Sequence, residues 1–284
     1  MKRTALILLW LLTAEFITAQ DVTRLWGEHP DNYRKKAVLL YSYPAAERQS
    51  HKALIICPGG SYCYLAKENE GFSPAQLFNT YGYDCYVLLY RRGMRGNRYP
   101  SQIQDLQIAM HHIKTHYAKY DTIGVCGFSA GGHLSGTSAI YFNKDFNNIF
   151  NGNTPTNYFR PDFSIMIYPV ITMQEGYVHR KSRRNLLGQY YTEQAKDSMS
   201  LELHVHNQMP PMFVINCTDD PIVDYHNSII FNEALNAAGV YHHYKLYNVG
   251  GHGFGVKPER IKSDDKSAAE WHKDFVKFIS RQNQ

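Results

Sequence analysis

Residues 124–133 read GVCGFSAGGH, in which a serine follows an apolar run and is flanked closely by glycines. The run Ile123–Phe128 predicts a buried strand, and the residues after Ser129 predict a helix. Small residues suit a tight strand-to-helix turn because the two elements crowd together there. The spacing Gly127, Ser129, Gly131 is that of the G-x-S-x-G elbow, whose strained turn exposes the serine hydroxyl. Ser129 is therefore a candidate nucleophile, although an incidental turn would give the same five residues.

The rest of the chain alternates short apolar runs with longer amphipathic ones. The predicted strands are Ala37–Tyr43, Ala53–Cys57, Asp84–Tyr90, Ile123–Phe128, Phe163–Val170, Met212–Thr218 and Tyr241–Tyr247. Several of them are continuous apolar runs, as expected for central parallel strands buried on both faces. The predicted helices are Pro74–Tyr81, Ser101–Tyr117, Ala130–Tyr141, His226–Ala238 and Lys266–Ser280. This alternation predicts an α/β fold, with a mostly parallel central sheet flanked by helices.

Residues 21–284 show no interdomain linker, so we expect a single domain there. Two stretches interrupt the alternation of strands and helices. The polar, Asn-rich stretch Asn143–Tyr158 is expected to be a loop. The irregular segment 174–200 is a candidate cap over a pocket, and whether it closes is left open.

Residues 1–20 have the pattern of a secretory signal peptide. Lys2 and Arg3 precede an apolar run, and the small residues Thr18-Ala19 follow it. The run is too short for a confident membrane span, and no cysteine follows it to carry a lipid. We therefore expect an exported protein, periplasmic or extracellular, without a membrane anchor.

The formal net charge of +5 comes without basic blocks, which argues against nucleic-acid binding. Four arginines (Arg91, Arg92, Arg95 and Arg98) do cluster, either as a solvated loop or as a contact for an acidic substrate. Five cysteines without a CxxC pair give no zinc or redox motif, and a Cys57–Cys63 bridge is conceivable. His204 and His206 form an H-x-H without a further ligand, so neither a metal nor another cofactor is predicted.

Four segments that contain candidate catalytic residues or glycine-rich turns come directly after predicted strands. They are CPGGSY (57–62), GFSAGG (127–132), TDDPIVD (218–224) and GGHGF (250–254). Ligands of open α/β sheets bind at the carboxyl ends of the strands, so we expect these segments to converge on one edge.

A serine hydroxyl needs a base within hydrogen-bond reach to act as a nucleophile. His252, in the glycine-rich loop after the last predicted strand, is the candidate base. A carboxylate must orient that histidine, and Asp219, Asp220 and Asp224 are all available. The chain order Ser…Asp…His is that of α/β-hydrolases.

Acyl transfer also needs backbone donors for the oxyanion that forms. The N–H of Ala130, directly after the serine, is one candidate. The Gly59-Gly60-Ser61 turn supplies others, and we expect Gly60 and Ser61 to contribute them. Pro58 stands where an HGGG-type loop has histidine, whose side chain is not itself the donor.

Together these segments resemble the small secreted α/β-hydrolases of the acetyl-esterase and acetylxylan-esterase-like type, over roughly residues 38–280. The motifs that carry the resemblance include PGGSY (58–62), Glu70-Gly71, YRRG…YP (90–100), GFSAGGHL (127–134), RNLLG (184–188), DDPIVDYHNS (219–228) and GGHGFG (250–255). The resemblance implies the α/β-hydrolase fold, with Ser129 as nucleophile and His252 as base. It favours Asp220 over Asp219 as the acid, because in the family the acid precedes the valine, here Val223, by three residues. The chain departs from the family at Asp224, where proline is usual, and at Ser61, where glycine is usual.

The function that this resemblance implies is a secreted serine esterase that removes acetyl groups from plant polysaccharides through an acyl-enzyme. Tyr62, Tyr64 and Tyr99 are candidates for a wall on which a sugar ring stacks, and packing would explain them equally. The alternatives are an esterase for a feruloyl or short-chain lipid ester, and a carbohydrate-binding homologue without activity. A peptidase is a more distant alternative. Neither the polysaccharide nor the oligomeric state follows from the sequence.

Overall fold

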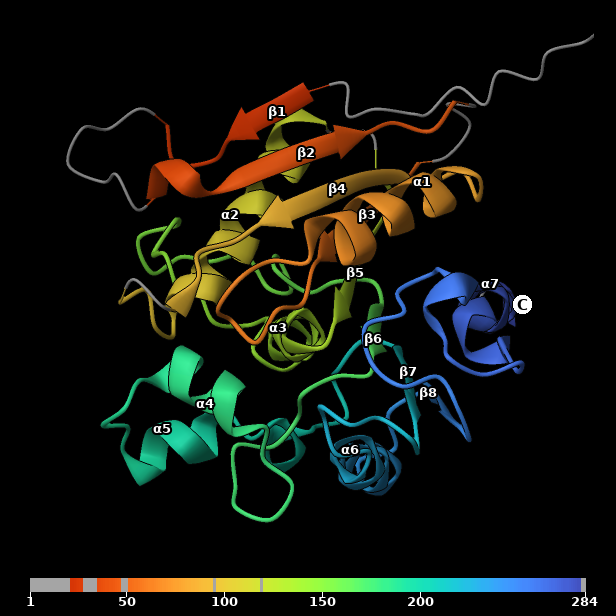
Figure 1. The fold of residues 1–284 in the computed structure, drawn as a ribbon. Coiled ribbons are helices and arrows are strands. Elements are labelled where there is room, and N and C mark those ends of the chain that lie inside the picture. Colours follow the sequence, from red (N-terminus) through yellow and green to blue (C-terminus); the bar gives the residue numbers. More distant parts are fainter. Residues whose placement is uncertain (1–20, 28–34, 47–50, 94–95, 118–119, 282–284) are drawn as a thin grey trace, which may run out of the picture.

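The computed structural model describes residues 21–27, 35–46, 51–93, 96–117 and 120–281. Eight strands form one sheet in the order β1-β2-β4-β3-β5-β6-β7-β8 (Figure 1). The first two, β1 (Asp21–Arg24) and β2 (Leu39–Tyr43), pair antiparallel, and β2 is also antiparallel to β4. The remaining strands run parallel to one another: β3 (Lys52–Cys57), β4 (Asp84–Leu89), β5 (Thr122–Phe128), β6 (Ser164–Ile167), β7 (Met212–Cys217) and β8 (His242–Tyr247). The predicted α/β fold with a mostly parallel sheet is confirmed.

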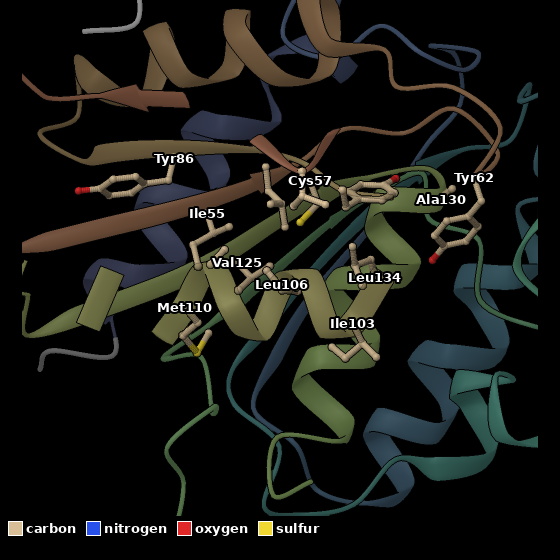
Figure 2. Close-up of a cluster of buried hydrophobic side chains, with 14 of the residues drawn as sticks. Ile55, Cys57, Tyr62, Tyr86, Ile103, Leu106, Met110, Val125, Ala130 and Leu134 are labelled. Carbon is tan, nitrogen blue, oxygen red and sulfur yellow. The ribbon is translucent and has the colours of Figure 1, made fainter. Parts of the chain in front are cut away.

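Helices cover both faces of the sheet because its central strands alternate between two apolar cores. On one face α2 (Ser101–His116) and α3 (Ala130–Ile140) pack against inward residues such as Ile55 and Val125 (Figure 2). On the other face α1 (Ser73–Asn79) and α7 (Trp271–Ser280) pack against Leu54 and Ile56. Helix α6 (His226–Ala237) completes a third cluster with the end of α3.

Most predicted elements match the structure to within one or two residues. Strand β6 is the main exception, because it ends at Ile167 rather than at Val170. Tyr168 has φ 38°, outside the extended region, and Pro169 follows it. The predicted C-terminal helix is also divided, into a 3₁₀ turn (Ser267–Glu270) and α7.

Segment 174–200 is more regular than expected, since it carries α4 (Arg180–Leu187) and α5 (Glu193–Ser198). This helix pair lies outside the layers that flank the sheet (Figure 1). Short turns occur at Lys35–Ala37, Glu68–Phe72 (π-helical), Leu201–His204 and Pro258–Arg260. The Asn-rich stretch 143–158 contains neither helix nor strand in the structure, as predicted. Residues 1–20 lie outside the described ranges, and none of the helices within those ranges is long and apolar enough to cross a membrane.

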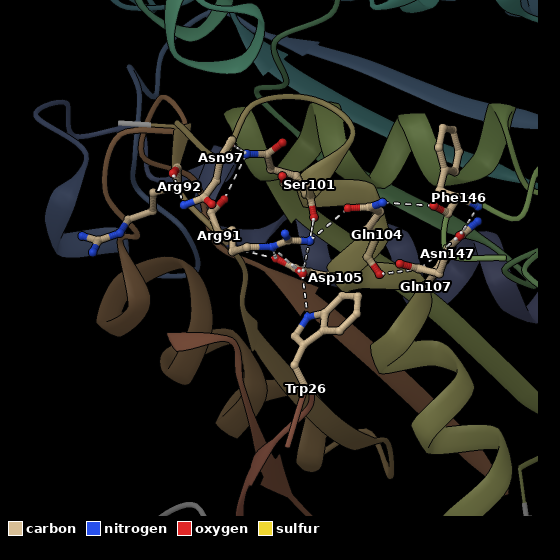
Figure 3. Close-up of polar contacts among 11 residues, drawn as sticks. Trp26, Arg91, Arg92, Asn97, Ser101, Gln104, Asp105, Gln107, Phe146 and Asn147 are labelled. Carbon is tan, nitrogen blue, oxygen red and sulfur yellow. Dashed lines mark hydrogen bonds and ion pairs between the residues drawn. The ribbon is translucent and has the colours of Figure 1, made fainter. Parts of the chain in front are cut away.

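Of the four clustered arginines after β4, Arg95 lies outside the described ranges, and Arg91 forms a buried ion pair (Figure 3). The Arg91 guanidinium lies 2.8 Å from Asp105 of α2, whose carboxylate also accepts the Arg91 backbone N–H and the Trp26 indole N–H. Both charged side chains are almost fully buried. Arg91 therefore anchors the loop to α2. Because its charge is already paired inside the protein, neither of the two interpretations, a solvated arginine or a contact for an acidic substrate, fits Arg91.

Candidate active site

Ser129 stands in a strained turn between β5 and α3. Its φ of 53° and ψ of −118° lie in a region that non-glycine residues rarely occupy. The turn is held by a hydrogen bond from the Ser129 N–H to the Ile167 carbonyl at 2.9 Å. Such strain persists only where the surroundings enforce it, and it is typical of functional sites.

The two glycines of the elbow are required by close backbone contact. A Cβ on Gly127 would lie 1.9 Å from the Gly131 carbonyl oxygen. A Cβ on Gly131 would lie 2.0 Å from the carbonyl oxygen of Cys57 in the neighbouring strand. Helix α3 thus begins directly against β3 and β5, and only glycine fits at these two positions.

The structure places Ser129, His252 and Asp220 in one hydrogen-bonded line. The Nε2 atom of His252 lies 2.9 Å from Ser129 Oγ, and its Nδ1 atom lies 2.6 Å from Asp220 Oδ2. A carboxylate only accepts, so Nδ1 carries the proton and Nε2 is free to accept the serine proton. The side chain of Asp220 is 1% exposed and Ser129 as a residue is 3% exposed, which keeps water from competing for these bonds.

The three candidate aspartates have different partners. Asp220 receives two backbone N–H bonds on Oδ1, from Ile222 and Val223, which fixes the carboxylate beneath His252. Asp219 instead accepts the N–H groups of Gly250 and Gly251. Asp224 contacts His226, a different histidine. Geometry therefore leaves Asp220 as the one candidate in contact with His252.

The loop after β3 borders the same cavity as Ser129. Gly60, Ser61 and Tyr62 have φ values of 128°, 56° and 57°, which bend the chain sharply there. The Gly59 N–H is bound to Glu70 Oε2, whereas no group in the described part of the chain accepts from the N–H of Gly60 or Ser61. Ala130 is the first residue of α3, so its N–H has no partner within the helix. These three donors are those expected for an oxyanion.

A cavity of about 320 Å³ opens over Ser129 and His252. Gly60, Ser61 and Ala66 form part of its wall, and Tyr64 and Ile222 add apolar surface. His179 and Lys181 reach it from the start of α4, so the 174–200 segment does border the pocket. Burial and the neighbouring His252 lower the pKa of His179.

The predicted tyrosine wall is only partly present. Tyr64 lines the cavity and is 53% exposed. Tyr62 is 1% exposed and bonds its hydroxyl to His133 Nδ1 at 2.8 Å, because the left-handed turn directs it into the core near Ala130 and Leu134 (Figure 2). Tyr99 is half-buried against Phe146 and does not border the cavity. The assignment of Tyr62 and Tyr99 to a sugar-stacking wall is therefore wrong.

The sequence also offered a pair of histidines for a metal ion and a pair of cysteines for a disulfide. His204 and His206 each bond to a different backbone carbonyl, of Asp197 and Ile140. Within the described ranges, no group of three or more His, Cys, Asp or Glu residues is arranged to hold a metal ion. None of the five cysteines, all within the described ranges, is joined in a disulfide, so the conceivable Cys57–Cys63 bridge is not formed.

Glu70 is the residue at this site that the sequence did not single out for a role. It lies in the π-helical turn Glu68–Phe72, borders the cavity and is 3% exposed. A glutamate in the polar stretch ENEGF has the pattern of a surface residue, and only its place in the family motif Glu70-Gly71 marked it.

Comparison with known proteins agrees with this geometry. The model of the BD-FAE family matches residues 40–235, so the chain belongs to this family of α/β-hydrolase esterases. An acetylxylan esterase of Xylanibacter ruminicola is 31% identical over 215 residues, which are 74% of this chain and 42% of that protein. Endo-1,4-beta-xylanase B of Butyrivibrio fibrisolvens is 30% identical over 250 residues, 84% of this chain and 38% of that protein. The chain thus spans about two fifths of these curated relatives.

Solved structures show the same fold over nearly the whole chain. The acetyl ester-xyloside bifunctional hydrolase of Caldicellulosiruptor lactoaceticus superposes with a TM-score of 0.80 at 25% identity, covering 94% of this chain and 99% of that one. A carboxylesterase of Lactobacillus plantarum gives a TM-score of 0.72 at 22% identity over 87% of this chain and 92% of that one. The α/β-hydrolase fold expected from the resemblance is confirmed.

Proposed function

We propose that this BD-FAE family member is a serine carboxyl-ester hydrolase that removes acetyl groups from plant polysaccharides or oligosaccharides. The observation that carries the proposal is the line Ser129–His252–Asp220 beside three unpaired backbone N–H groups. The names of the relatives, an acetylxylan esterase and an acetyl ester-xyloside hydrolase, support the carbohydrate substrate.

In the first half of the reaction, Ser129 Oγ attacks the ester carbonyl carbon while His252 Nε2 takes its proton. Asp220 stabilises the imidazolium that forms. The N–H groups of Gly60, Ser61 and Ala130 hold the oxyanion of the tetrahedral intermediate. Collapse of the intermediate breaks the bond to the sugar oxygen, and His252 returns the proton to that oxygen.

The second half of the reaction hydrolyses the acetyl–Ser129 ester. A water molecule attacks its carbonyl carbon while His252 takes a proton from the water. The same oxyanion donors stabilise the second tetrahedral intermediate. Its collapse breaks the ester bond to Ser129 Oγ, which regains the proton from His252, and acetate leaves.

The shape of the cavity favours a small acyl group on a polar alcohol. Its lining includes the small residues Gly60, Ser61 and Ala66, and apolar surface is limited to a few side chains such as Ile222. A feruloyl group would need a longer apolar slot than this lining offers. Tyr64, exposed at the cavity, provides one aromatic face for a sugar ring.

Release of acetate from acetylated xylo-oligosaccharides tests the proposal, with Ser129→Ala as the matched inactive variant. We expect rapid release by the native protein and loss of release in the variant. Cleavage of a feruloyl or longer-chain ester in preference to the acetylated sugar would favour the alternative acyl group. Hydrolysis of no ester, with sugar binding intact in Ser129→Ala, would favour a non-catalytic carbohydrate-binding role.

Export is part of the same proposal, and the pattern of residues 1–20 supports it. Mass spectrometry of the protein recovered from its native host should show a chain that begins near residue 21. A chain that retains Met1 would contradict export by this route.

A further inference from the structure

The mechanism above leaves one buried charged group of the cavity unused. The Glu70 carboxyl lies beneath the same cavity that exposes Ser129 and His252. Burial raises the pKa of Glu70, while the neighbouring His252 and hydrogen bonds from Tyr168 and Gly59 act in the opposite direction. Burying a carboxyl group costs free energy unless hydrogen bonds satisfy its oxygens, so the contacts of Glu70 indicate what this residue does.

Each oxygen of Glu70 accepts a bond from a different part of the site. Oε2 accepts the N–H of Gly59, the residue before the oxyanion donors, at 2.9 Å. Oε1 accepts the hydroxyl proton of Tyr168, also at 2.9 Å. The Tyr168 oxygen in turn accepts the N–H of Gly255, in the loop that carries His252, at 2.9 Å. One carboxylate therefore joins the oxyanion loop to the histidine loop.

The hydrogen bonds that Glu70 accepts favour its ionised form. The Tyr168 oxygen already accepts from Gly255, so the single hydroxyl proton of Tyr168 is directed at Glu70. The other oxygen of Glu70 faces a backbone N–H, which can only donate. A proton on Glu70 would find no acceptor among these partners while both of them donate to it. His252 and Arg260 are the cationic or protonatable groups close enough to influence the carboxylate.

The turn that carries Glu70 contacts the histidine loop at further points. Asn69 donates its side-chain N–H to the backbone carbonyl of Gly253. The backbone carbonyl of Asn69 lies so close to Gly255 that a Cβ would not fit there. The ring of Tyr168 lies 4.6 Å from that of His252, measured between ring centres. The π-helical geometry of residues 68–72 fits this function, since such turns are frequent at functional sites.

We propose that Glu70 is a positioning residue, which holds the loop of the oxyanion donors and the loop of His252 in fixed positions relative to each other. It also places a second negative charge, besides Asp220, near the imidazolium that forms during the reaction. The inference rests on the proposed esterase function and concerns the same site.

Glu70→Gln tests the proposal, because it keeps the shape and removes the charge. Its amide also places an N–H donor against either Gly59 or Tyr168. With 4-nitrophenyl acetate we expect kcat to fall about 10- to 100-fold, less than when an oxyanion donor itself is lost, and KM to change much less. The acid limb of the profile of kcat/KM against pH should move to lower pH, because a negative charge near His252 is lost.

Two further variants make the test specific. Glu68→Gln changes an exposed glutamate of the same turn, whose ion-pair partner within the described ranges is Lys67 at the surface, and should leave kcat and the pH profile unchanged. Tyr168→Phe breaks the bond to Gly255 without altering charge and should lower kcat without moving the acid limb. In the double variant that combines Tyr168→Phe with Glu70→Gln, the loss in kcat, expressed as a free energy, should be smaller than the sum of the two single losses. Tyr168→Phe keeps the link testable if Glu70→Gln does not fold.

The outcomes separate this inference from the proposed function. A folded Glu70→Gln protein with native kcat would overturn the inference. A fall in kcat that follows a fall in melting temperature, with the acid limb unmoved, would show a purely structural role and also overturn it. If the native protein hydrolysed no ester, the esterase proposal itself would fail, and the inference with it.

Discussion

His252 and Ser129 lie 123 positions apart in the chain, yet the Nε2 atom of one is 2.9 Å from the hydroxyl oxygen of the other. The parallel sheet produces this contact. Ser129 follows β5, and His252 lies in the loop after β8, at the same edge of the sheet. The elbow then fixes the serine in a single strained conformation.

Neighbouring aspartates should respond very differently to the same substitution. Asp220→Asn replaces the acceptor of the His252 Nδ1 proton with an amide that favours the wrong histidine tautomer. We expect kcat for 4-nitrophenyl acetate to fall by about 10⁴-fold, as in other Ser-His-Asp sites. Asp219→Asn keeps one of the two oxygens that accept the N–H groups of Gly250 and Gly251, and it leaves the acceptor of His252 in place, so its loss should be far smaller. Equal losses in the two variants would contradict the assignment.

Gly131→Ala should destabilise the protein more than Gly132→Ala. Both changes favour the helix by similar amounts, which makes them a matched pair. The new Cβ at position 131 would lie 2.0 Å from the rigid carbonyl oxygen of Cys57, whereas at position 132 the nearest atom is Pro169 Cβ at 2.8 Å. We expect Gly131→Ala to lose at least about 1–3 kcal/mol of unfolding free energy relative to Gly132→Ala. Urea denaturation measures the difference, and the reverse order would contradict the packing described.

Acid should destabilise the fold through His133. Burial lowers the pKa of His133 from its ordinary 6.5 to about 4. Between these pH values the unfolded chain binds the proton and the folded chain does not, so stability falls as the pH falls from 6.5 to 4. The full effect of this single group is about 3 kcal/mol.

The unfolding free energy of the native protein and of His133→Gln, each measured at pH 7 and pH 5, isolates this contribution. The native protein should lose more stability than the variant on acidification. The same loss in both proteins would show that His133 already titrates normally in the fold.

The buried pair Arg91–Asp105 should matter far more to stability than an exposed pair. Asp105→Asn leaves the nearly fully buried Arg91 guanidinium without its counter-charge, and such losses amount to about 3–5 kcal/mol. Arg180→Gln removes an exposed contact with Glu175, and such pairs contribute about 0–1 kcal/mol. Thermal unfolding of the two variants should show a large shift for the first only; similar shifts would mean that the pair is not desolvated in solution.

The central sheet could be predicted because its strands are buried on both faces. Strands β3, β5 and β7 are continuous apolar runs, and their predicted ends are correct to within one residue. Strand β1 lacks this signal, since it is an exposed edge strand of four residues. Helix α4 begins RKSRR, and this charge obscured a helix in which four of the eight residues are buried.

The contact of Ser129, His252 and Asp220 could be anticipated from the sequence because the chemistry of an ester hydrolase limits the choices. The residues that support them could not be anticipated in this way. Serine, histidine and aspartate occur in a fixed order with glycines that the turn requires. The partners of Glu70 and Tyr62 depend instead on contacts between segments far apart in the chain, Tyr168 and His133 respectively. No local pattern distinguishes a glutamate that accepts two buried bonds from one on the surface.

The account is tested most directly by trapping the acyl-enzyme. The native protein is mixed with an acetyl ester, quenched in acid during turnover and digested, and the peptide that contains Ser129 is weighed by mass spectrometry. We predict that this peptide gains one acetyl group, and that the gain is absent in Ser129→Ala. Ester hydrolysis that continues in Ser129→Ala, or an acetyl group on a different residue during turnover, would contradict the account.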